Sequence, residues 1–264
     1  MPETKIEVNP YEDKEVYVAG YEKNGTKDVA KVWKNGVATS LTNGSNDAQT
    51  NSVYVSSNDV YVAGYEKKGE KSIAKVWKNG VATTLTKGPN DARANSVYVS
   101  GTNVYVAGYE SNGTKSVAKV WKNGVATSLT NGSNDAVANS VYVSGTDVYV
   151  AGDEKTGPQS VAKVWKNGVA TSLTGGSDNG HPSILYSAHA NSVYVSGTDV
   201  YVAGDERNGK FTGIAKVWKN GVATSLSPDS KGSYPRSVYV SGTDVYVAGS
   251  ENIGVYTGGI GILQ

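Results

Sequence analysis

The chain has 264 residues, with 25 Lys and Arg against 24 Asp and Glu and a formal net charge of +1. This balance argues against a nucleic-acid-binding protein, which normally carries a clear basic excess, and against an acidic tail. Cysteine is absent, which excludes disulfides, thiolate metal sites and a cysteine nucleophile.

The start of the chain gives no sign of a targeting segment. Residues 1–7 lack a basic region followed by an apolar run, so they do not form a signal peptide. No later run approaches the roughly 18 apolar residues that a membrane-spanning helix needs, so we expect no membrane span. The compartment stays open: the protein would be secreted or at a bacterial cell surface if a signal peptide had been removed.

One unit of about 44 residues recurs along the whole chain. Each copy contains Val-Tyr-Val-Ala-Gly, and the first five continue into Ala-Lys-Val-Trp-Lys-Asn-Gly. The string begins at Val16, Val60, Val104, Val148, Val200 and Val245. Six repeats fill residues 1–264 and leave no room for a second domain, so the sequence predicts a single domain.

The third repeat predicts four short strands, over 96–100, 103–108, 116–121 and 125–129. Val, Tyr, Thr and Trp favour the pleated backbone, and the Asn-Gly pairs at 112–113 and 123–124 favour type I′ hairpin turns. Gly, Asn and β-branched residues recur too often for a helix. Each repeat is therefore expected to be a four-stranded antiparallel meander, connected to the next repeat over residues 130–139.

Both faces of this predicted sheet are apolar. The two sets are Tyr105, Ala107 and Val120 on one face, and Val104, Val106 and Trp121 on the other. A sheet that is apolar on both faces must be covered on both, and a ring of sheets achieves this because each packs against two neighbours. The predicted fold class is all-β: a closed six-bladed β-propeller with four-stranded antiparallel blades.

The last blade is expected to be incomplete, because the chain stops at Gln264 before a fourth strand. Residues 5–8 either form the inner strand of the first blade or add to the edge of the last one. We favour the first option, since only seven residues separate Val8 from Val16. The last blade then keeps an exposed edge, which predicts a monomer or weak self-association through that edge.

The strand order, the Gly after the second strand (Gly108) and the Trp that ends the third (Trp121) resemble WD40-like propellers. The Trp-Asp pair of that family is Trp121-Lys122 here, and its Gly-His pair is absent. The resemblance therefore concerns the fold and implies no chemistry. The near identity of the units resembles bacterial propellers with recently amplified repeats, or an engineered consensus.

A Glu follows each Val-Tyr-Val-Ala-Gly string. The six are Glu22, Glu66, Glu110, Glu154, Glu206 and Glu251. We expect exposed ion pairs at the hairpin ends, Glu110 with Lys115, in preference to a functional ring of carboxylates; each pair contributes under about 1 kcal/mol. The repeated Trp residues are likewise expected to pack between blades and not to stack on sugars.

The loops between the first four blades repeat an Asn-Asp pair that contains Asp47, Asp91 and Asp135. Asp and Asn side chains readily bond neighbouring backbone amides, so we expect these residues to fix the loops. The alternative is a polar pocket for a sugar or a metal between the blades.

The repeats differ most around the fifth blade. The preceding loop is eight residues longer than the others and holds both histidines, His181 and His189. Surface loops accept length cheaply, so a tolerated insertion is the simplest interpretation. The alternatives are a ligand-contacting loop, or a metal site of His181, His189 and Asp178, whose spacing matches no established motif.

Two further irregularities lie beside this loop. Residues 227–236 form a second odd connection, and Asp153 and Asp205 stand where the first three repeats have Tyr. A site for one small ligand needs asymmetry, so this rim is the best candidate. The candidate binding residues are Asp178, His181, Tyr186, His189, Tyr234 and Arg236, together with Asp47, Asp91 and Asp135.

No catalytic motif is present, so we predict no catalytic residue, no metal and no cofactor. The predicted function is a non-catalytic scaffold that binds an unknown protein or glycan. One alternative is a glycan- or small-molecule-acting hydrolase or lyase with His189, His181 or Asp178 as acid or base. The other is an amplified or designed scaffold without a ligand.

Overall fold

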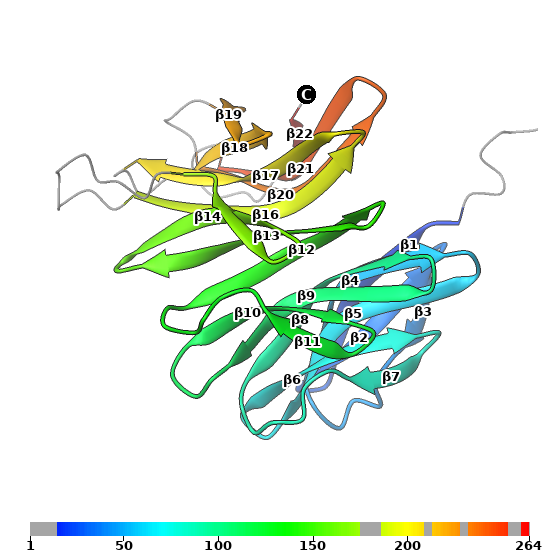
Figure 1. The fold of residues 1–264 in the computed structure, drawn as a ribbon. Helices are drawn as coiled ribbons and strands as arrows, with labels where there is room; N and C mark the ends of the chain where they lie inside the picture. Colours follow the sequence, from blue (N-terminus) through cyan, green and yellow to red (C-terminus); the bar gives the residue numbers. More distant parts are fainter. Residues whose placement is uncertain (1–14, 175–185, 209–212, 228–231, 253–259, 264) are drawn as a thin grey trace, which may run out of the picture.

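The computed structural model describes residues 15–174, 186–208, 213–227, 232–252 and 260–263. Within these ranges the chain forms 22 strands and no helix (Figure 1). The described part of the chain accordingly has no helix that is long and apolar enough to cross a membrane.

The strands form six antiparallel sheets, one for each repeat, which we number one to six in chain order. Sheet one contains β1 (Tyr17–Asn24), β2 (Lys27–Lys34) and β3 (Val37–Ser40), and sheet two contains β4 (Ala48–Ser56), β5 (Asp59–Lys68), β6 (Lys71–Lys78) and β7 (Val81–Thr84). Sheet three contains β8 (Ala92–Ser100), β9 (Asn103–Ser111), β10 (Ser116–Lys122) and β11 (Val125–Ser128), and sheet four contains β12 (Ala136–Ser144), β13 (Asp147–Thr156), β14 (Gln159–Lys166) and β15 (Val169–Ser172). Sheet five contains β16 (Tyr186–Ser196), β17 (Asp199–Asn208), β18 (Ile214–Lys219) and β19 (Val222–Ser225), and sheet six contains β20 (Ser233–Ser241), β21 (Asp244–Glu251) and β22 (Ile260–Leu263).

Each sheet is a meander in which neighbouring strands pair in chain order. Sheets two to five have the four predicted strands, and sheet six has three in the described part of the chain, as expected for its last strands. Sheet one has three strands in the described part of the chain. Residues 5–8, predicted as its inner strand, lie outside the described residues.

The hairpin turn between the third and fourth strands of each repeat follows from its Asn-Gly pair. In sheet three, Asn123 has a φ of 51° and Gly124 a φ of 82°. A type I′ turn needs positive φ at both positions, which Asn and Gly adopt at the lowest cost. The predicted type I′ turn at 123–124 is confirmed.

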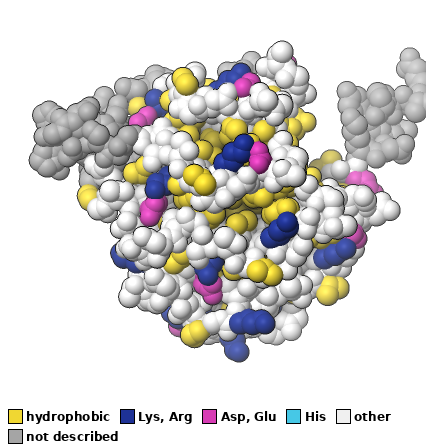
Figure 2. All heavy atoms as spheres, viewed as in Figure 1, with side chains coloured by type: hydrophobic (Ala, Val, Ile, Leu, Met, Phe, Trp, Pro, Cys, Tyr) yellow, Lys and Arg dark blue, Asp and Glu magenta, His cyan; other side chains and the backbone are white. Residues whose placement is uncertain are grey.

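The loop after β9 is wider than predicted, and this changes the partner of Glu110. Residues 112–115 form the loop instead of a two-residue turn. The carboxylate of Glu110 lies 2.6 Å from Nζ of Lys119, while Lys115 binds Asp135. The equivalent Glu–Lys pair recurs in sheets one to five, and Figure 2 shows cationic and anionic side chains lying side by side on the surface. A repeated Glu–Lys ion pair is therefore present, but the predicted exposed pair of Glu110 with Lys115 is wrong: the partner is Lys119, and only 20% of the Glu110 side chain and 18% of the Lys119 side chain are exposed.

The two apolar faces of each sheet pack against different neighbours. In sheet three, Val106 and Trp121 are buried against sheet two, whereas Tyr105 and Ala107 are buried against sheet four. The two predicted sets are thus the two observed faces. The tryptophans of sheets two to five are fully buried at these junctions: Trp77, Trp121, Trp165 and Trp218. Packing between sheets, and not exposure to sugars, is confirmed for them.

A β-bulge interrupts the first strand of sheets two to six. In sheet five the register shifts between Ala190 and Ser192, next to Gly204 of β17. A Cβ on Gly204 would lie 1.9 Å from the carbonyl oxygen of His189. Only glycine allows the two strands to approach this closely, which explains why every string that faces a described first strand ends in Gly.

The six sheets form an open row and not a closed ring. Figure 1 shows sheet one (blue) at the right and sheet six (orange to red) at the top, with the other sheets following between them. Each sheet packs extensively on the next, but no such contact joins sheets one and six within the described ranges. The predicted closed ring is therefore wrong. Each internal junction buries two apolar faces in a row as well as in a ring. Closure would therefore bury additional apolar surface only on the outer faces of sheets one and six.

Candidate functional site at the junction of sheets four and five

The loop aspartates hold the backbone of the preceding sheet. Asp47, Asp91 and Asp135 each accept a hydrogen bond from a backbone N–H, at 3.1, 2.8 and 3.0 Å. These bonds hold the pKa of Asp47 and of Asp135 below the usual value of 3.8. This is the structural role expected for the three residues, and the alternative pocket for a sugar or metal stays a prediction.

The long loop before sheet five contributes one described side chain. Asp178 and His181 lie outside the described residues, and Tyr186 begins β16 with only its backbone described. His189 lies further along β16, directly opposite Asp205 of β17. Among the candidates from this loop, His189 is therefore the one whose side chain the structure describes.

The candidates from the second odd loop lie on β20. Tyr234 is half-buried beside Gly213, where a Cβ would lie 2.8 Å from its ring. Arg236 is exposed. Between them, the carbonyl of Pro235 accepts a hydrogen bond of 2.7 Å from Asn191 of sheet five. Tyr234 thus packs against sheet five, whereas Arg236 faces solvent.

One cross-strand pair varies between the repeats, and it occupies the same register position in each of sheets two to six. The residue after each string Gly lies opposite a first-strand residue, and the pairs are Gln49–Tyr65, Arg93–Tyr109, Val137–Asp153, His189–Asp205 and Tyr234–Ser250. The remainder of these strands is nearly identical between repeats. This row of pairs is therefore where the units acquire different chemistry.

The first half of the row is a polar cluster that joins neighbouring sheets. The hydroxyl of Tyr65 donates to Oε1 of Gln49 at 2.7 Å, and Nε2 of Gln49 donates to Asp28 at 2.8 Å. The guanidinium of Arg93 lies 4.4 Å from the centre of the Tyr65 ring, a cation–π contact. These partners stabilise the junctions of the first three sheets.

The second half replaces the tyrosines by two carboxylates around a histidine. Nδ1 of His189 lies 3.3 Å from Oδ2 of Asp205, with 31% of the His189 side chain exposed and only 6% of the Asp205 side chain. Nδ2 of Asn139 donates to Asp153 at 3.3 Å and to the carbonyl of Ala190 at 3.0 Å. Asn139 thereby joins sheet four to sheet five beside Asp153.

The surroundings favour different protonation states for these groups. Burial raises the pKa of Asp153 above 3.8, and repulsion by Asp205 adds to this, while His189 and Asn139 partly oppose it. The hydrogen bond with Asp205 raises the pKa of His189 above 6.5, and attraction to Asp153 reinforces it. Burial therefore favours the neutral form of Asp153, whereas the hydrogen bond with Asp205 favours the protonated form of His189.

Two members of this cluster were not among the predicted site residues. Asp153 and Asp205 are visible in the sequence as replacements of Tyr, but their partner is set by strand register. The first two strands of the fifth repeat are longer than predicted, and the bulge shifts their register by one residue. With that shift, Asp205 lies opposite His189. The substitution pattern and the register together would have found the cluster.

The described ranges contain no group of three or more His, Asp or Glu side chains that could hold a metal ion. The metal alternative of Asp178, His181 and His189 has two members outside these ranges. It stays a prediction.

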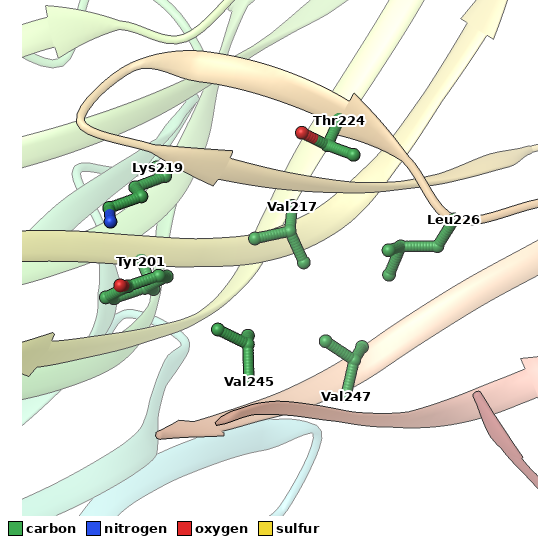
Figure 3. A pocket seen from close by; sticks show the side chains of 7 residues that line it. All are labelled: Tyr201, Val217, Lys219, Thr224, Leu226, Val245 and Val247. Atoms are coloured by element: carbon green, nitrogen blue, oxygen red, sulfur yellow. The ribbon is translucent and has the colours of Figure 1, made fainter. Parts of the chain in front are cut away.

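Equivalent apolar cavities recur at three junctions. They lie between sheets three and four, four and five, and five and six, with volumes of about 190, 220 and 240 Å³. The last is lined by Tyr201, Val217, Lys219, Thr224, Leu226, Val245 and Val247, and Figure 3 shows side chains of sheet five facing the two valines of β21. None of the three cavities is lined by the Asp153–His189–Asp205 cluster.

No protein-family model and no curated protein matches the chain. Among solved structures, the hydrazine synthase of Kuenenia stuttgartiensis is 11% identical with a TM-score of 0.54, over 93% of this chain and 43% of that one. This chain thus spans less than half of that protein, and the likeness concerns the fold alone. A thermostable family-43 glycoside hydrolase is 12% identical with a TM-score of 0.47, over 76% of this chain and 83% of that one. An α-L-arabinofuranosidase from Lactobacillus brevis is 10% identical with a TM-score of 0.47, over 79% and 85%.

The prediction of a non-catalytic scaffold and the prediction that the protein is not an enzyme are not upheld by these comparisons, since all three structures are named as enzymes. The glycoside hydrolases among them agree better with the alternative of a glycan-acting hydrolase. Their TM-scores of 0.47 assign neither an activity nor a residue to this chain. An all-β, propeller-like arrangement of repeated antiparallel sheets is shown, while the WD40-like resemblance and a bacterial surface location stay predictions.

Proposed function

We propose that the protein is a glycan-acting hydrolase with its site at the junction of sheets four and five. The observation that carries the proposal is the cluster of Asp153, His189 and Asp205, in which two carboxyl groups occupy contrasting surroundings. Glycoside hydrolysis uses such a pair: one protonated carboxyl serves as the acid, and one ionised carboxylate acts on water or on the sugar.

Asp153 is the general acid in this proposal. Its burial favours the protonated form, and it is held by one weak donor, Asn139 at 3.3 Å. It gives its proton to the glycosidic oxygen as the bond to the anomeric carbon breaks. The first strand offers Val137 opposite Asp153, so no cross-strand side chain competes for that proton.

Asp205 is the second carboxylate. Nδ1 of His189 lies 3.3 Å from Oδ2 of Asp205, and the partial exposure of His189 places the pair at the border of solvent. Asp205 takes the proton of the water that attacks the anomeric carbon. That proton replaces the one lost by Asp153 through solvent, which balances the cycle.

The test begins with a panel of aryl glycosides and plant or bacterial polysaccharides. With any glycan cleaved, Asp153→Asn and Asp205→Asn are each expected to lower kcat by about 10²- to 10⁴-fold. Asp153→Asn should affect aryl glycosides with good leaving groups less than Asp205→Asn, because such groups need little protonation.

The matched control is Asp147→Asn. Asp147 lies on the same strand β13 but pairs with Lys166 at 2.7 Å on the surface, so its loss should leave kcat unchanged. A protein that cleaves nothing on the panel, or an Asp153→Asn variant with full activity on all substrates, would overturn the proposal.

A further inference from the structure

The outer faces of sheets one and six leave apolar side chains exposed. On sheet one, Val16 is 61% and Val18 53% exposed; on sheet six, Tyr239 is 55% and Tyr246 51% exposed. The counterparts of Val18 and Tyr246 inside the row are 1% and 7–8% exposed, namely Val62, Val106, Val150 and Val202, and Tyr61, Tyr105, Tyr149 and Tyr201. The end faces are thus made of side chains that the row otherwise buries.

An internal junction shows what these side chains pack against. Between sheets two and three, Val104, Val106 and Trp121 of the later sheet pack on Tyr61 and Ala63 of the earlier one. The same combination recurs at the following junctions. The three junctions from sheet two to sheet five therefore join a Val–Val–Trp face to a Tyr–Ala face, whereas sheet six covers Tyr201 and Ala203 with valines and no Trp.

The outer faces of sheets one and six each carry one side of this kind of junction. Val16, Val18 and Trp33 of sheet one are the repeat counterparts of the Val–Val–Trp face, and all three keep exposed surface. Tyr246 and Ala248 of sheet six are the counterparts of the Tyr–Ala face, and both are exposed. Sheet one thus carries part of the surface that covers a Tyr–Ala face inside the row; the first-strand part, such as Val97 and Val99 at the junction of sheets two and three, has its counterpart outside the described residues.

A ladder of tyrosines ends at the same open face. Ring centres of successive tyrosines are 4.7–5.1 Å apart from sheet two to sheet six, in the order Tyr54, Tyr98, Tyr142, Tyr194 and Tyr239. Within the described residues Tyr239 has a ring neighbour on one side only. The last rung therefore presents a free aromatic surface.

We propose that sheet one of one copy docks on sheet six of another, so that copies associate head to tail. A second copy is the occupant because a Val–Val–Trp face already packs on a Tyr–Ala face at the three junctions from sheet two to sheet five. Such an interface joins two different surfaces, so each added copy exposes a new end and the assembly grows with concentration.

One inter-sheet bond changes at this contact. The Asn at the bulge donates to a carbonyl of the next sheet at four junctions, through Asn51, Asn95, Asn139 and Asn191. Arg236 stands at this position in sheet six. The contact between copies lacks this bond, so it is weaker than a junction within one copy and reversible on dilution.

The test uses the full chain in sedimentation velocity over a concentration series. Wild type should show a weight-average mass that rises above 27.6 kDa with concentration. Val18→Asp and Tyr246→Asp should each remain monomeric, because each has lost one half of the interface. An equimolar mixture of the two variants should reach twice the single-chain mass and grow no further, because each pair keeps only one complementary contact.

Val37→Asp is the matched control: Val37 is 71% exposed on β3, and its counterparts Val81, Val125, Val169 and Val222 are 72% exposed throughout the row. Its self-association should equal that of wild type, and circular dichroism confirms that each variant is folded. A wild type that stays monomeric at all concentrations would overturn the proposal, as would a Val18→Asp variant that still dimerises or a mixture that forms no pair.

Discussion

His189 interacts with carboxylates from two different sheets, and this makes its charge part of the junction. The hydrogen bond with Asp205 raises its pKa above 6.5, Asp153 reinforces the rise, and burial and Arg207 oppose it. A group whose pKa is raised by folding stabilises the folded state while it is protonated. The stabilisation is complete below the unfolded pKa of about 6.5 and is lost as the pH rises through the folded value.

We therefore expect His189→Gln to lower the free energy of unfolding more at about pH 5.5 than at about pH 8.5, because glutamine carries no charge at either pH. Urea unfolding of both proteins across this range measures the difference. In an Asp205→Asn background, where the main partner is neutral, the pH dependence of the same substitution should shrink. Equal losses at both pH values in the native background would contradict the electrostatic role of His189.

The sequence predicted where the repeats lose their symmetry, but it did not predict which side chains meet. His189, Asp153 and Asp205 are separated by up to 52 residues, and their proximity depends on the register of β16 on β17 and on the packing of sheet four on sheet five. A one-residue slip in either would turn these side chains to the other face. Residue type alone could not provide that information.

At the scale of strands, the bulge explains both the repeated Gly and the position of His189. The Cβ of any other residue at 204 would overlap the His189 carbonyl, 1.9 Å away. In sheet one, by contrast, the nearest described atom to a Cβ on Gly20 is a side-chain atom of Trp33 at 3.2 Å. Both glycines end a Val-Tyr-Val-Ala-Gly string, but they differ in what they touch.

Gly204→Ala is therefore expected to destabilise the protein by about 1–3 kcal/mol, because β16 and β17 must move apart. Gly20→Ala should cost less than this, since the Trp33 ring can shift by a few tenths of an ångström. Thermal and urea unfolding of the two variants compares them directly. An equal loss at both positions would show that the bulge does not set the need for glycine.

Strand identity and turn type were predictable because they depend on neighbouring residues. The Asn-Gly pair at 123–124 forms the expected turn, and the alternation of Tyr105 and Val106 gives the two observed faces. The loop at 112–115 departs from prediction because Asn112 bonds the backbone N–H groups of Thr114 and Lys115 at 3.1 and 2.9 Å. An Asn side chain that bonds its own loop competes with the tight turn.

For the whole molecule, closure is the property that local patterns could not predict. Apolar faces on both sides of a sheet require neighbours, but a row and a ring provide the same neighbours to sheets two to five. The two architectures differ only in the fate of Val18, Tyr246 and the side chains around them. The Val-Tyr-Val-Ala-Gly strings that carry Val18 and Tyr246 are the same as those in the middle of the row, so these strings contain no local signal for an open end.

An open row predicts that stability falls toward both ends. Each sheet is stabilised by its immediate neighbours, as in other repeat proteins, and the end sheets have one neighbour instead of two. Local opening should therefore require less free energy in sheets one and six.

In dilute protein, amide hydrogen exchange followed by mass spectrometry should be faster in β1–β2 and β20–β21 than in β9–β10 and β13–β14. Raising the protein concentration should slow exchange at the two ends and leave sheets three and four unchanged, because copies that dock head to tail give each end its missing neighbour. Equal protection of all six sheets at every concentration would instead indicate a ring in solution.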